Sequence, residues 1–390
     1  MHSTLPVQQE HPERRPPPAP APPGGAGAGP AGRGGRLAAL DGLRLCAALM
    51  VVAYHYIAFD SGAWPRPAQT LFPVAHLPAA YGWLGVQLFF LISGFVICMS
   101  CWGKSVGDFA VSRVTRLYPA YWFAVLAVTL VVSLWRSPVN AVPSLRNVAV
   151  NLTMLQDPLG VEPVDGVYWT LWVELRFYLL FALVLRKGLT YRRAVGFCAV
   201  WAFAAVVAKA ADDRALALLL MPHDCWYFIA GIAFYLMYRF RPDPVLWLIV
   251  AGCLLIAQHD LLGAHARAEG YMGHHVPRWP TTLLLALFFL ALAAVALGWT
   301  HRVRGRWLST AGVLTYPLYL IHERIGWAVI HRAEGHMPRY VLLPALVTAM
   351  LLAAWLVHRH VERPLARLLT RGLQRAMTQA RTADTAVRTG

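Results

Sequence analysis

Two polar side chains stand in the first long apolar stretch of the sequence. The segment LDGLRLCAALMVVAYHY, residues 40–56, contains Arg44 and His55. Eleven residues make about three α-helical turns, so both side chains would lie on one helix face, about 16 Å apart. The spacing suits two groups that reach different parts of one extended ligand. The alternative is that Arg44 extends to the membrane surface and His55 ends the helix.

The chemistry available to these residues depends on their neighbours. A neutral imidazole such as that of His55 accepts a proton near neutral pH, which is the work of a general base. Asp41 precedes Arg44 by three residues and is within pairing reach on a helix. The Asp41–Arg44 pair is either a structural ion pair or a part of the site.

A second candidate group is a pair of arginines, Arg113 and Arg116, which precede the third apolar stretch. They are one helical turn apart, so both can face one ligand, and guanidinium groups match phosphate oxygens in two-pronged hydrogen bonds. The alternative is anchoring on lipid headgroups. We expect a phosphate-bearing ligand.

Glu174 lies well inside the apolar segment VYWTLWVELRFYLLF, residues 167–181. A carboxylate in such a helix requires a partner. It can orient His55, bind a ligand or pair with an arginine for structure. Arg176 is two residues away and points elsewhere, so it is not the expected partner.

A third pair, His322 and Glu323, follows Tyr316-Pro317 in an apolar segment that is interrupted by polar residues. Irregular backbone at membrane depth is tolerated where it is buried in protein or lines a water-filled cavity. We predict that His322 and Glu323 line such a cavity and bind a substrate, although a simple kink at the proline is an equal alternative.

Four histidines crowd one outer loop, at positions 259, 265, 274 and 275. Their spacings match no standard metal motif. The cysteine pair Cys98 and Cys101 has no second pair beside it. We therefore expect a solvated histidine loop and no metal.

The composition indicates an all-α integral membrane protein. Of 390 residues, 58% are hydrophobic and 14% charged, against about half and a quarter in soluble domains. About ten apolar stretches are long enough, or nearly so, to cross a bilayer. They lie near residues 38–58, 82–100, 119–135, 167–185, 194–209, 215–238, 244–258, 281–299, 309–330 and 340–358.

The basic charge of the chain is distributed as the positive-inside rule requires. With the N-terminus in the cytoplasm, the cytoplasmic segments hold 23 lysines and arginines and the outer loops hold 9, which places both ends inside. The formal net charge of +16 lies in short loops and tails, so nucleic acid is a poor interpretation. We expect a disordered Pro/Gly-rich cytoplasmic tail over 1–36, a membrane domain over 37–366 and a basic cytoplasmic tail over 367–390, with no fused soluble domain.

Several segments together resemble one known family. Arg44, ten residues and His55 form the R-X10-H signature of the acyltransferase 3 membrane family. Leu314-Thr315 departs slightly from a more usual Ile-Ser. Other segments resemble further elements of that family, in family order: GWLGVQLFFLISGFVI at 82–97, FAVSRVTRLYPAYW at 109–122, VYWTLWVELRFYLLF at 167–181, LTYPLYLIHERIG at 314–326 and VERPL at 361–365.

The resemblance implies a ten-span enzyme that moves an acyl group, acetyl by default, from acyl-CoA to a hydroxyl. The acceptor would be a sugar on a glycan or on a glycosylated small molecule such as a macrolide. His55 would be the base, helped by Arg44 and Glu174. Acyl-CoA would contact Arg44, Arg113 and Arg116, and the acceptor would contact His322, Glu323 and Asp41.

The location would be the plasma membrane, with the lipid bilayer as the surroundings. The sequence leaves the oligomeric state open. A transporter or flippase for the same glycan or antibiotic is the alternative, because intramembrane charges and a broken helix also suit transport. The two halves of the sequence, however, show no repeat.

Overall fold

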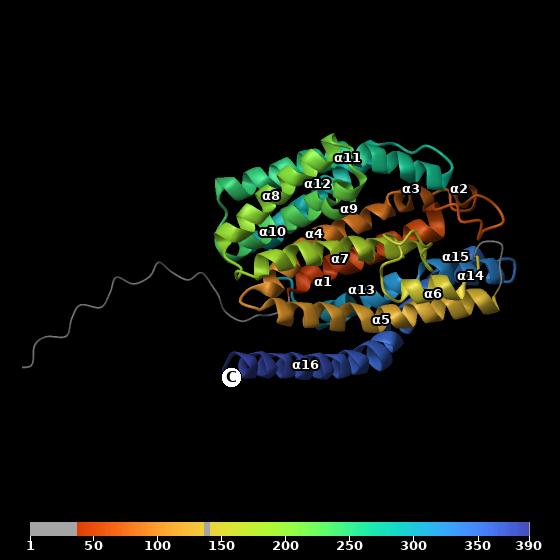
Figure 1. Cartoon of the computed structure of the whole chain (residues 1–390). Helices are drawn as coiled ribbons and strands as arrows, with labels where there is room; N and C mark the ends of the chain where they lie inside the picture. The colour runs from red at the N-terminus through yellow and green to blue at the C-terminus, as the bar shows by residue number, and fades with distance from the viewer. Residues whose placement is uncertain (1–36, 136–140, 390) are drawn as a thin grey trace, which may run out of the picture. The chain divides into compact units, whose positions relative to one another are not determined.

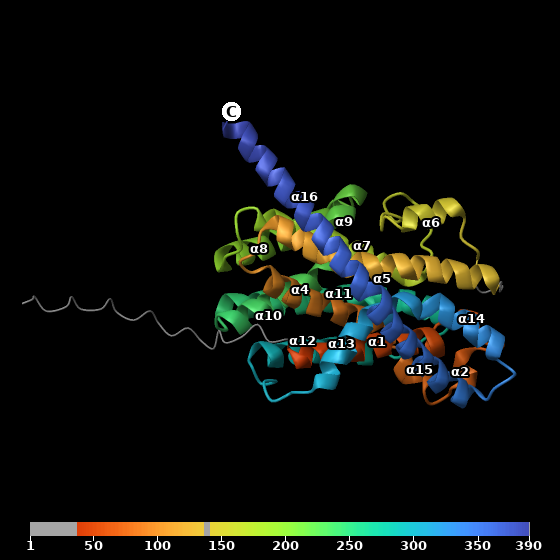
Figure 2. The same cartoon turned by 90° about the horizontal axis from the view of Figure 1, so that it is seen from below.

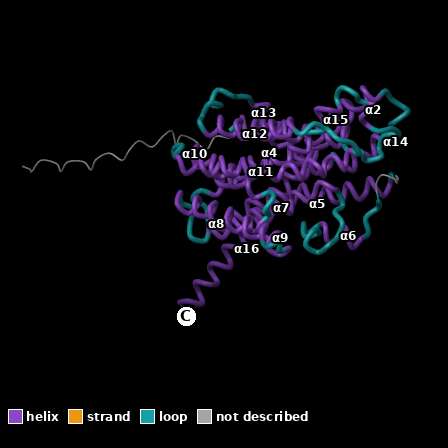
Figure 3. Tube along the Cα trace, turned by 90° about the horizontal axis from the view of Figure 1, so that it is seen from above, coloured by secondary structure: helices purple, strands orange, loops and turns teal. Residues whose placement is uncertain are grey.

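The fold consists of helices and loops in a computed structural model that describes residues 37–135 and 141–389 (Figure 1). The expected tail over 1–36 lies outside the described residues. Within that part of the chain there is no strand, as the colouring in Figure 3 shows. The helices are α1 (Ala38–Ala53), η1 (Tyr54–Ala58), α2 (Ala68–Leu71), α3 (His76–Ala79), η2 (Gly82–Leu84), α4 (Gly85–Cys101), α5 (Val106–Leu134), α6 (Leu145–Asn151), η3 (Gly166–Tyr168), α7 (Trp169–Leu185), α8 (Tyr191–Ala210), α9 (Arg214–Leu220), α10 (Cys225–Arg239), α11 (Pro244–Met272), α12 (Trp279–Ala296), α13 (Arg306–Ile321), α14 (Glu323–Ala333), α15 (Arg339–Val357), η4 (His358–Glu362) and α16 (Arg363–Thr389).

The described residues include nine helical stretches that are long and apolar enough to cross a membrane, and one shorter apolar helix, Trp307–Ile321. This confirms an all-α, multi-pass membrane protein. The seventh span is much longer than expected, because α11 runs for 29 residues. The expected break in the ninth span is real, but it lies at His322. The helix continues through Pro317 and ends at Ile321.

The centre of the bundle is a close crossing of α4 and α10. A Cβ atom on Gly94 would lie 2.2 Å from the carbonyl oxygen of Phe228, and one on Gly231 would lie 2.2 Å from that of Leu91. Neither helix can therefore carry a larger residue at the crossing point. This close approach holds α4 in place, and α4 forms one wall of both pockets described below.

The end of the first span is a π-helix, η1, which contains His55. The wider turn is held by two indole side chains, one from α14 and one from the loop that follows η1. The indole Nε1 of Trp327 donates to the carbonyl oxygen of His55 at 2.9 Å, and that of Trp64 donates to the carbonyl oxygen of Tyr56 at 2.9 Å. The Tyr56 hydroxyl in turn donates to the carbonyl oxygen of His322 at 2.8 Å. These contacts join η1 to the break between α13 and α14.

The third span begins earlier than expected. α5 starts at Val106, where the side chain of Ser105 caps it by accepting from the backbone N–H of Asp108 at 3.2 Å, and it runs for 29 residues. Arg113 and Arg116, which were predicted to precede this span, therefore lie inside its helix.

The C-terminal region expected as a basic tail is helical. α15 passes through the π-helix η4 into α16, which continues to Thr389. α16 packs beside α5 and crosses it at an angle, as Figures 1 and 2 show. The domain boundary at residue 366 stays a prediction.

Candidate active site

Two pockets lie on either side of a thin partition in the bundle. The first, which we call the arginine pocket, has a volume of about 130 Å³ and is lined by Arg44, Arg113 and Arg116. The second, which we call the histidine pocket, has a volume of about 590 Å³ and is lined by His55 and Glu323. Arg44 and His55, which were predicted to lie on one helix face, therefore line two different pockets.

The arginine pocket holds its cations in different ways. Arg44 pairs with Asp41 at 3.6 Å. The guanidinium of Arg113 lies over the rings of Phe109 and Tyr178, at 6.0 and 5.8 Å from their centroids. Packing against aromatic faces fixes the direction of a guanidinium group without neutralising its charge.

Arg116 has an acidic partner from the C-terminal region. Its guanidinium bonds to Glu362 in η4, and it also lies over the ring of Tyr316 at 5.6 Å. Glu362 is buried and accepts a second contact from His358, whose Nδ1 lies 2.7 Å from the carboxylate. Arg116 is therefore both a wall of the pocket and a link to η4.

Glu174 finds its partners in the arginine pocket. It accepts hydrogen bonds from the Ser93 hydroxyl at 3.0 Å and from the Tyr178 hydroxyl. It lines the pocket that contains the arginines, and does not line the pocket that contains His55. Arg176 points away, as expected, and bonds to the carbonyl oxygens of Trp172 and Leu218.

The tautomer of His55 follows from its neighbours. Its Nδ1 lies 2.9 Å from the carbonyl oxygen of Val51 and 3.1 Å from Nε2 of His322. The Nδ1 of His322 lies 2.8 Å from the carbonyl oxygen of Tyr319. Since a carbonyl oxygen only accepts, both Nδ1 atoms carry hydrogen and His322 accepts from His55. The Nε2 atom of His55 is then left with a free lone pair, which is the form that a base requires.

Glu323 stands opposite this lone pair. Its Oε2 lies 3.8 Å from Nε2 of His55, and this oxygen has no hydrogen-bond partner within the described chain. The carboxyl group is buried, and the buried side chain of Asp165 accepts at 3.2 Å from the backbone N–H of Arg324, the residue that follows Glu323. A Cβ atom on Gly166 would lie 2.4 Å from Oε1 of Glu323, so a side chain at position 166 would displace this carboxyl group.

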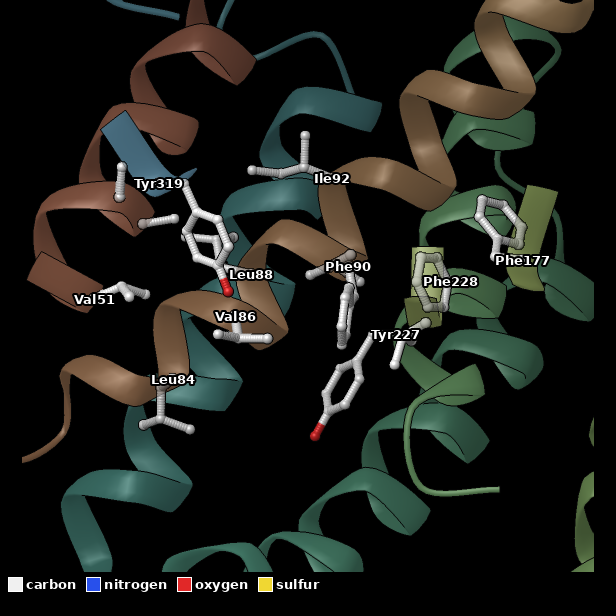
Figure 4. Close-up of a cluster of buried hydrophobic side chains, with 14 of the residues drawn as sticks. Val51, Leu84, Val86, Leu88, Phe90, Ile92, Phe177, Tyr227, Phe228 and Tyr319 are labelled. Atoms are coloured by element: carbon white, nitrogen blue, oxygen red, sulfur yellow. The ribbon is translucent and has the colours of Figure 1, made fainter. Parts of the chain in front are cut away.

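The partition between the pockets consists of Val86 on α4 and Tyr319 on α13, which line both of them (Figure 4). The Tyr319 hydroxyl is tethered to the Thr170 hydroxyl at 2.9 Å and donates to the carbonyl oxygen of Val167 at 3.3 Å. The ring of Phe89 packs edge-on against that of Tyr319, with centroids 5.8 Å apart. These contacts fix the position of the Tyr319 ring between the two pockets.

The structure brings most of the predicted site residues to one of these pockets. Asp41 and His322 are the exceptions, because both are buried and line neither pocket. His322 contacts Nδ1 of His55, and its predicted role in substrate binding stays a prediction. Asp41 pairs with Arg44. Its position favours the structural ion pair, and its role in substrate binding stays a prediction. Sequence reasoning missed Asp165 and Tyr319, which have no distinctive local pattern. Ser93 is a further residue of the arginine pocket, and its hydroxyl bonds to Glu174.

The outer histidines are not a solvated loop as a group. His265 is buried in α11, with its nitrogens 2.9 Å from the Thr281 hydroxyl and 3.2 Å from the carbonyl oxygen of Val276. His274 contacts His76, with 2.9 Å between their Nε2 atoms. Among the described residues, no three His, Cys, Asp or Glu side chains are grouped to hold a metal ion.

Comparison with known proteins identifies the family of the chain. The family described as "Acyltransferase domain" matches residues 37–359. The chain is similar to "Acyltransferase MdmB" of Streptomyces mycarofaciens, with 31% identity over 183 residues that cover 44% of this chain and 45% of that protein. It is also similar to "Nodulation protein 10" of Rhizobium leguminosarum bv. viciae, with 33% identity over 128 residues that cover 28% of this chain and 35% of that protein.

The matched segments thus span less than half the length of either curated relative. No solved structure matches the chain. The family match, in contrast, extends over most of the sequence and includes every residue that lines the partition between the two pockets. The chain belongs to the acyltransferase 3 family.

Proposed function

We propose that this protein is a membrane O-acyltransferase that moves an acyl group from acyl-CoA to a hydroxyl of a sugar-containing acceptor. Acetyl is the default acyl group, and the acceptor is a glycan or a glycosylated small molecule such as a macrolide. The observation that carries the proposal is the free Nε2 lone pair of His55 in one pocket, next to a pocket with three arginines.

The arginine pocket suits the donor. The phosphates of CoA would contact Arg113 and Arg44, whose charges face one small cavity. In the proposed topology both termini are cytoplasmic and the protein lies in the plasma membrane, so this pocket opens to the compartment that contains acyl-CoA. The thioester would then lie at the partition formed by Val86 and Tyr319.

The histidine pocket suits the acceptor. A hydroxyl oxygen placed between Nε2 of His55 and Oε2 of Glu323, which are 3.8 Å apart, would touch both atoms. His55 takes the hydroxyl proton as the oxygen attacks the thioester carbonyl. The C–S bond then breaks, and the CoA sulfur leaves with the proton that His55 returns. The products are an ester and CoA, and the enzyme returns to its starting state.

The test is product analysis with the purified full chain in lipid nanodiscs. We expect acetyl-CoA and a sugar-containing acceptor to give one acetylated product and an equal amount of free CoA, both detected by mass spectrometry. Consumption of acetyl-CoA must depend on the acceptor. If the protein instead moves the unmodified acceptor across vesicle membranes and forms no ester, the transporter interpretation replaces this one.

Arg113→Ala is expected to raise KM for acetyl-CoA by about tenfold, because one charge-assisted phosphate contact is worth roughly 1.5–3 kcal/mol. Steady-state kinetics at saturating acceptor measure this. Arg186→Ala removes a cationic side chain that lines neither pocket and is the matched control. Equal KM values in both variants would assign Arg113 to lipid anchoring.

His322 is expected to position His55 by accepting its Nδ1 hydrogen. His322→Ala should lower kcat by up to about a hundredfold, the size of effect that misplacement of a catalytic group produces, with little change in KM for acetyl-CoA. His322→Gln should recover part of the loss, because its amide oxygen can accept the same hydrogen. A glutamine variant as impaired as the alanine variant would mean that His322 acts only through packing.

A further inference from the structure

A third cavity, with a volume of about 320 Å³, lies where α13 meets α15, η4 and α16. It has no lining residue in common with the arginine pocket. Its polar lining consists of hydroxyls and basic groups, and it includes no acidic side chain. These residues are Ser309, Thr310, His358, Arg359 and Arg363.

His358 supplies a polar atom that lacks a partner. The side chain is only 10% exposed, and its Nδ1 is engaged by Glu362 at 2.7 Å. The other ring nitrogen, Nε2, has no hydrogen-bond partner within the described ranges of the chain. A buried polar atom of this kind costs free energy unless something satisfies it. Because the His358 ring lines the cavity, a ligand bound there can supply the missing partner of Nε2.

The two arginines define the charge of that ligand. The guanidinium of Arg359 lies over the ring of Trp355 at 5.2 Å, which fixes its plane while its N–H groups stay available. Arg363 follows one helical turn later and lines the same cavity. Two guanidinium forks on one side of a cavity match the oxygens of a phosphate group.

We propose that this cavity is a phosphate-binding site, separate from the donor pocket, in which Arg359 and Arg363 hold a phosphate group and a hydroxyl group of the same ligand donates to Nε2 of His358. The phosphate belongs either to an anionic phospholipid headgroup or to a small soluble phosphate compound; the chemistry of recognition is the same. The site adjoins the donor pocket through one chain of contacts, since His358 bonds to Glu362 and Glu362 bonds to Arg116.

The experiment uses the purified full chain in nanodiscs and does not depend on the proposed function. In one arm the nanodiscs contain phosphatidylcholine with a quarter phosphatidylglycerol, and native mass spectrometry counts the phosphatidylglycerol that the released protein retains. In the other arm the nanodiscs contain only phosphatidylcholine, and inorganic phosphate is titrated against the unfolding temperature. The test variant is Arg359→Gln with Arg363→Gln. The control is Arg367→Gln with Arg371→Gln, which removes the same charge from the following turns of α16, outside the cavity.

We expect the test variant to bind at least about tenfold more weakly than wild type in one arm, because it loses two charge-assisted contacts, while the control binds as wild type does. A difference only with phosphatidylglycerol identifies a lipid phosphate, and a difference only with inorganic phosphate identifies a soluble one. Equal loss in test and control, or no loss in either arm, overturns the proposal. If the glutamine variant unfolds at a lower temperature without ligand, Arg359→Lys with Arg363→Lys replaces it, which keeps the charge and loses the fork. Wild-type binding by the lysine variant would also overturn the proposal.

Discussion

Replacing His55 by alanine is expected to lower turnover by about 10²–10⁴, the usual contribution of a general base. The variant loses the Nε2 lone pair that faces the histidine pocket, so the acceptor hydroxyl has no group to take its proton. Binding of acetyl-CoA should persist, because His55 does not line the arginine pocket. The measurement is acetylated product per minute in matched amounts of folded protein, together with the dissociation constant for acetyl-CoA.

Arg44→Ala is the informative companion to this variant. Its side chain lines the arginine pocket, so its loss should weaken donor binding as well as turnover. If His55→Ala keeps more than about a tenth of wild-type turnover, His55 is not the general base. Parallel losses of donor affinity in both variants would also contradict the division into a donor pocket and an acceptor pocket.

Gly94→Ala and Gly231→Ala are expected to destabilise the bundle, each by about 1–3 kcal/mol or more, the range for overpacking a tight interior. Each new Cβ atom would stand 2.2 Å from a backbone carbonyl oxygen of the opposing helix. Backbone cannot turn aside as a flexible side chain does, so α4 and α10 must separate. Thermal unfolding in a mild detergent should show a lower midpoint and a lower yield of monodisperse protein.

Gly196→Ala and Gly252→Ala are matched controls for this comparison. Both glycines lie inside helices, on α8 and α11, and a Cβ atom at either position meets no heavy atom within 4 Å. Alanine should leave the midpoint unchanged or raise it slightly, since it favours helix by roughly 1 kcal/mol over glycine. If all four variants melted together, the close crossing of α4 and α10 would not limit stability.

The sequence predicted the membrane class and the main polar residues because both depend on local composition. Long apolar stretches have few structural solutions in a bilayer, and a charged group within one is rare enough to notice. The boundaries were less predictable. Arg113 and Arg116 precede the third apolar stretch, yet α5 begins before them and includes both. A helix that projects beyond the hydrocarbon can carry charge on its exposed turns.

The partners of the site residues were beyond prediction from sequence spacing. His55 meets His322 across 267 positions, and Arg116 meets Glu362 across 246. The π-helix that contains His55 could not be predicted from a local pattern of apolar residues. It depends on contacts with distant residues, such as the hydrogen bond from Trp327 to the carbonyl oxygen of His55. The prediction for Glu174 was likewise correct only in part. Its need for a partner was evident, but a local rule could not indicate Ser93, which lies 81 positions away.

The thin wall of Val86 and Tyr319 also has a consequence for the cell that contains this protein. In the proposed topology the two pockets would face opposite sides of the plasma membrane, and Val86 and Tyr319, which line both pockets, would then be part of the barrier against protons and ions. The contact of the Tyr319 hydroxyl with Thr170 would help to keep this barrier closed. A substitution such as Val86→Gly would enlarge the space between the two pockets and could admit bulkier acyl groups. A continuous water path through the protein would, however, dissipate the membrane potential, and this sets a limit on how far the wall can be opened.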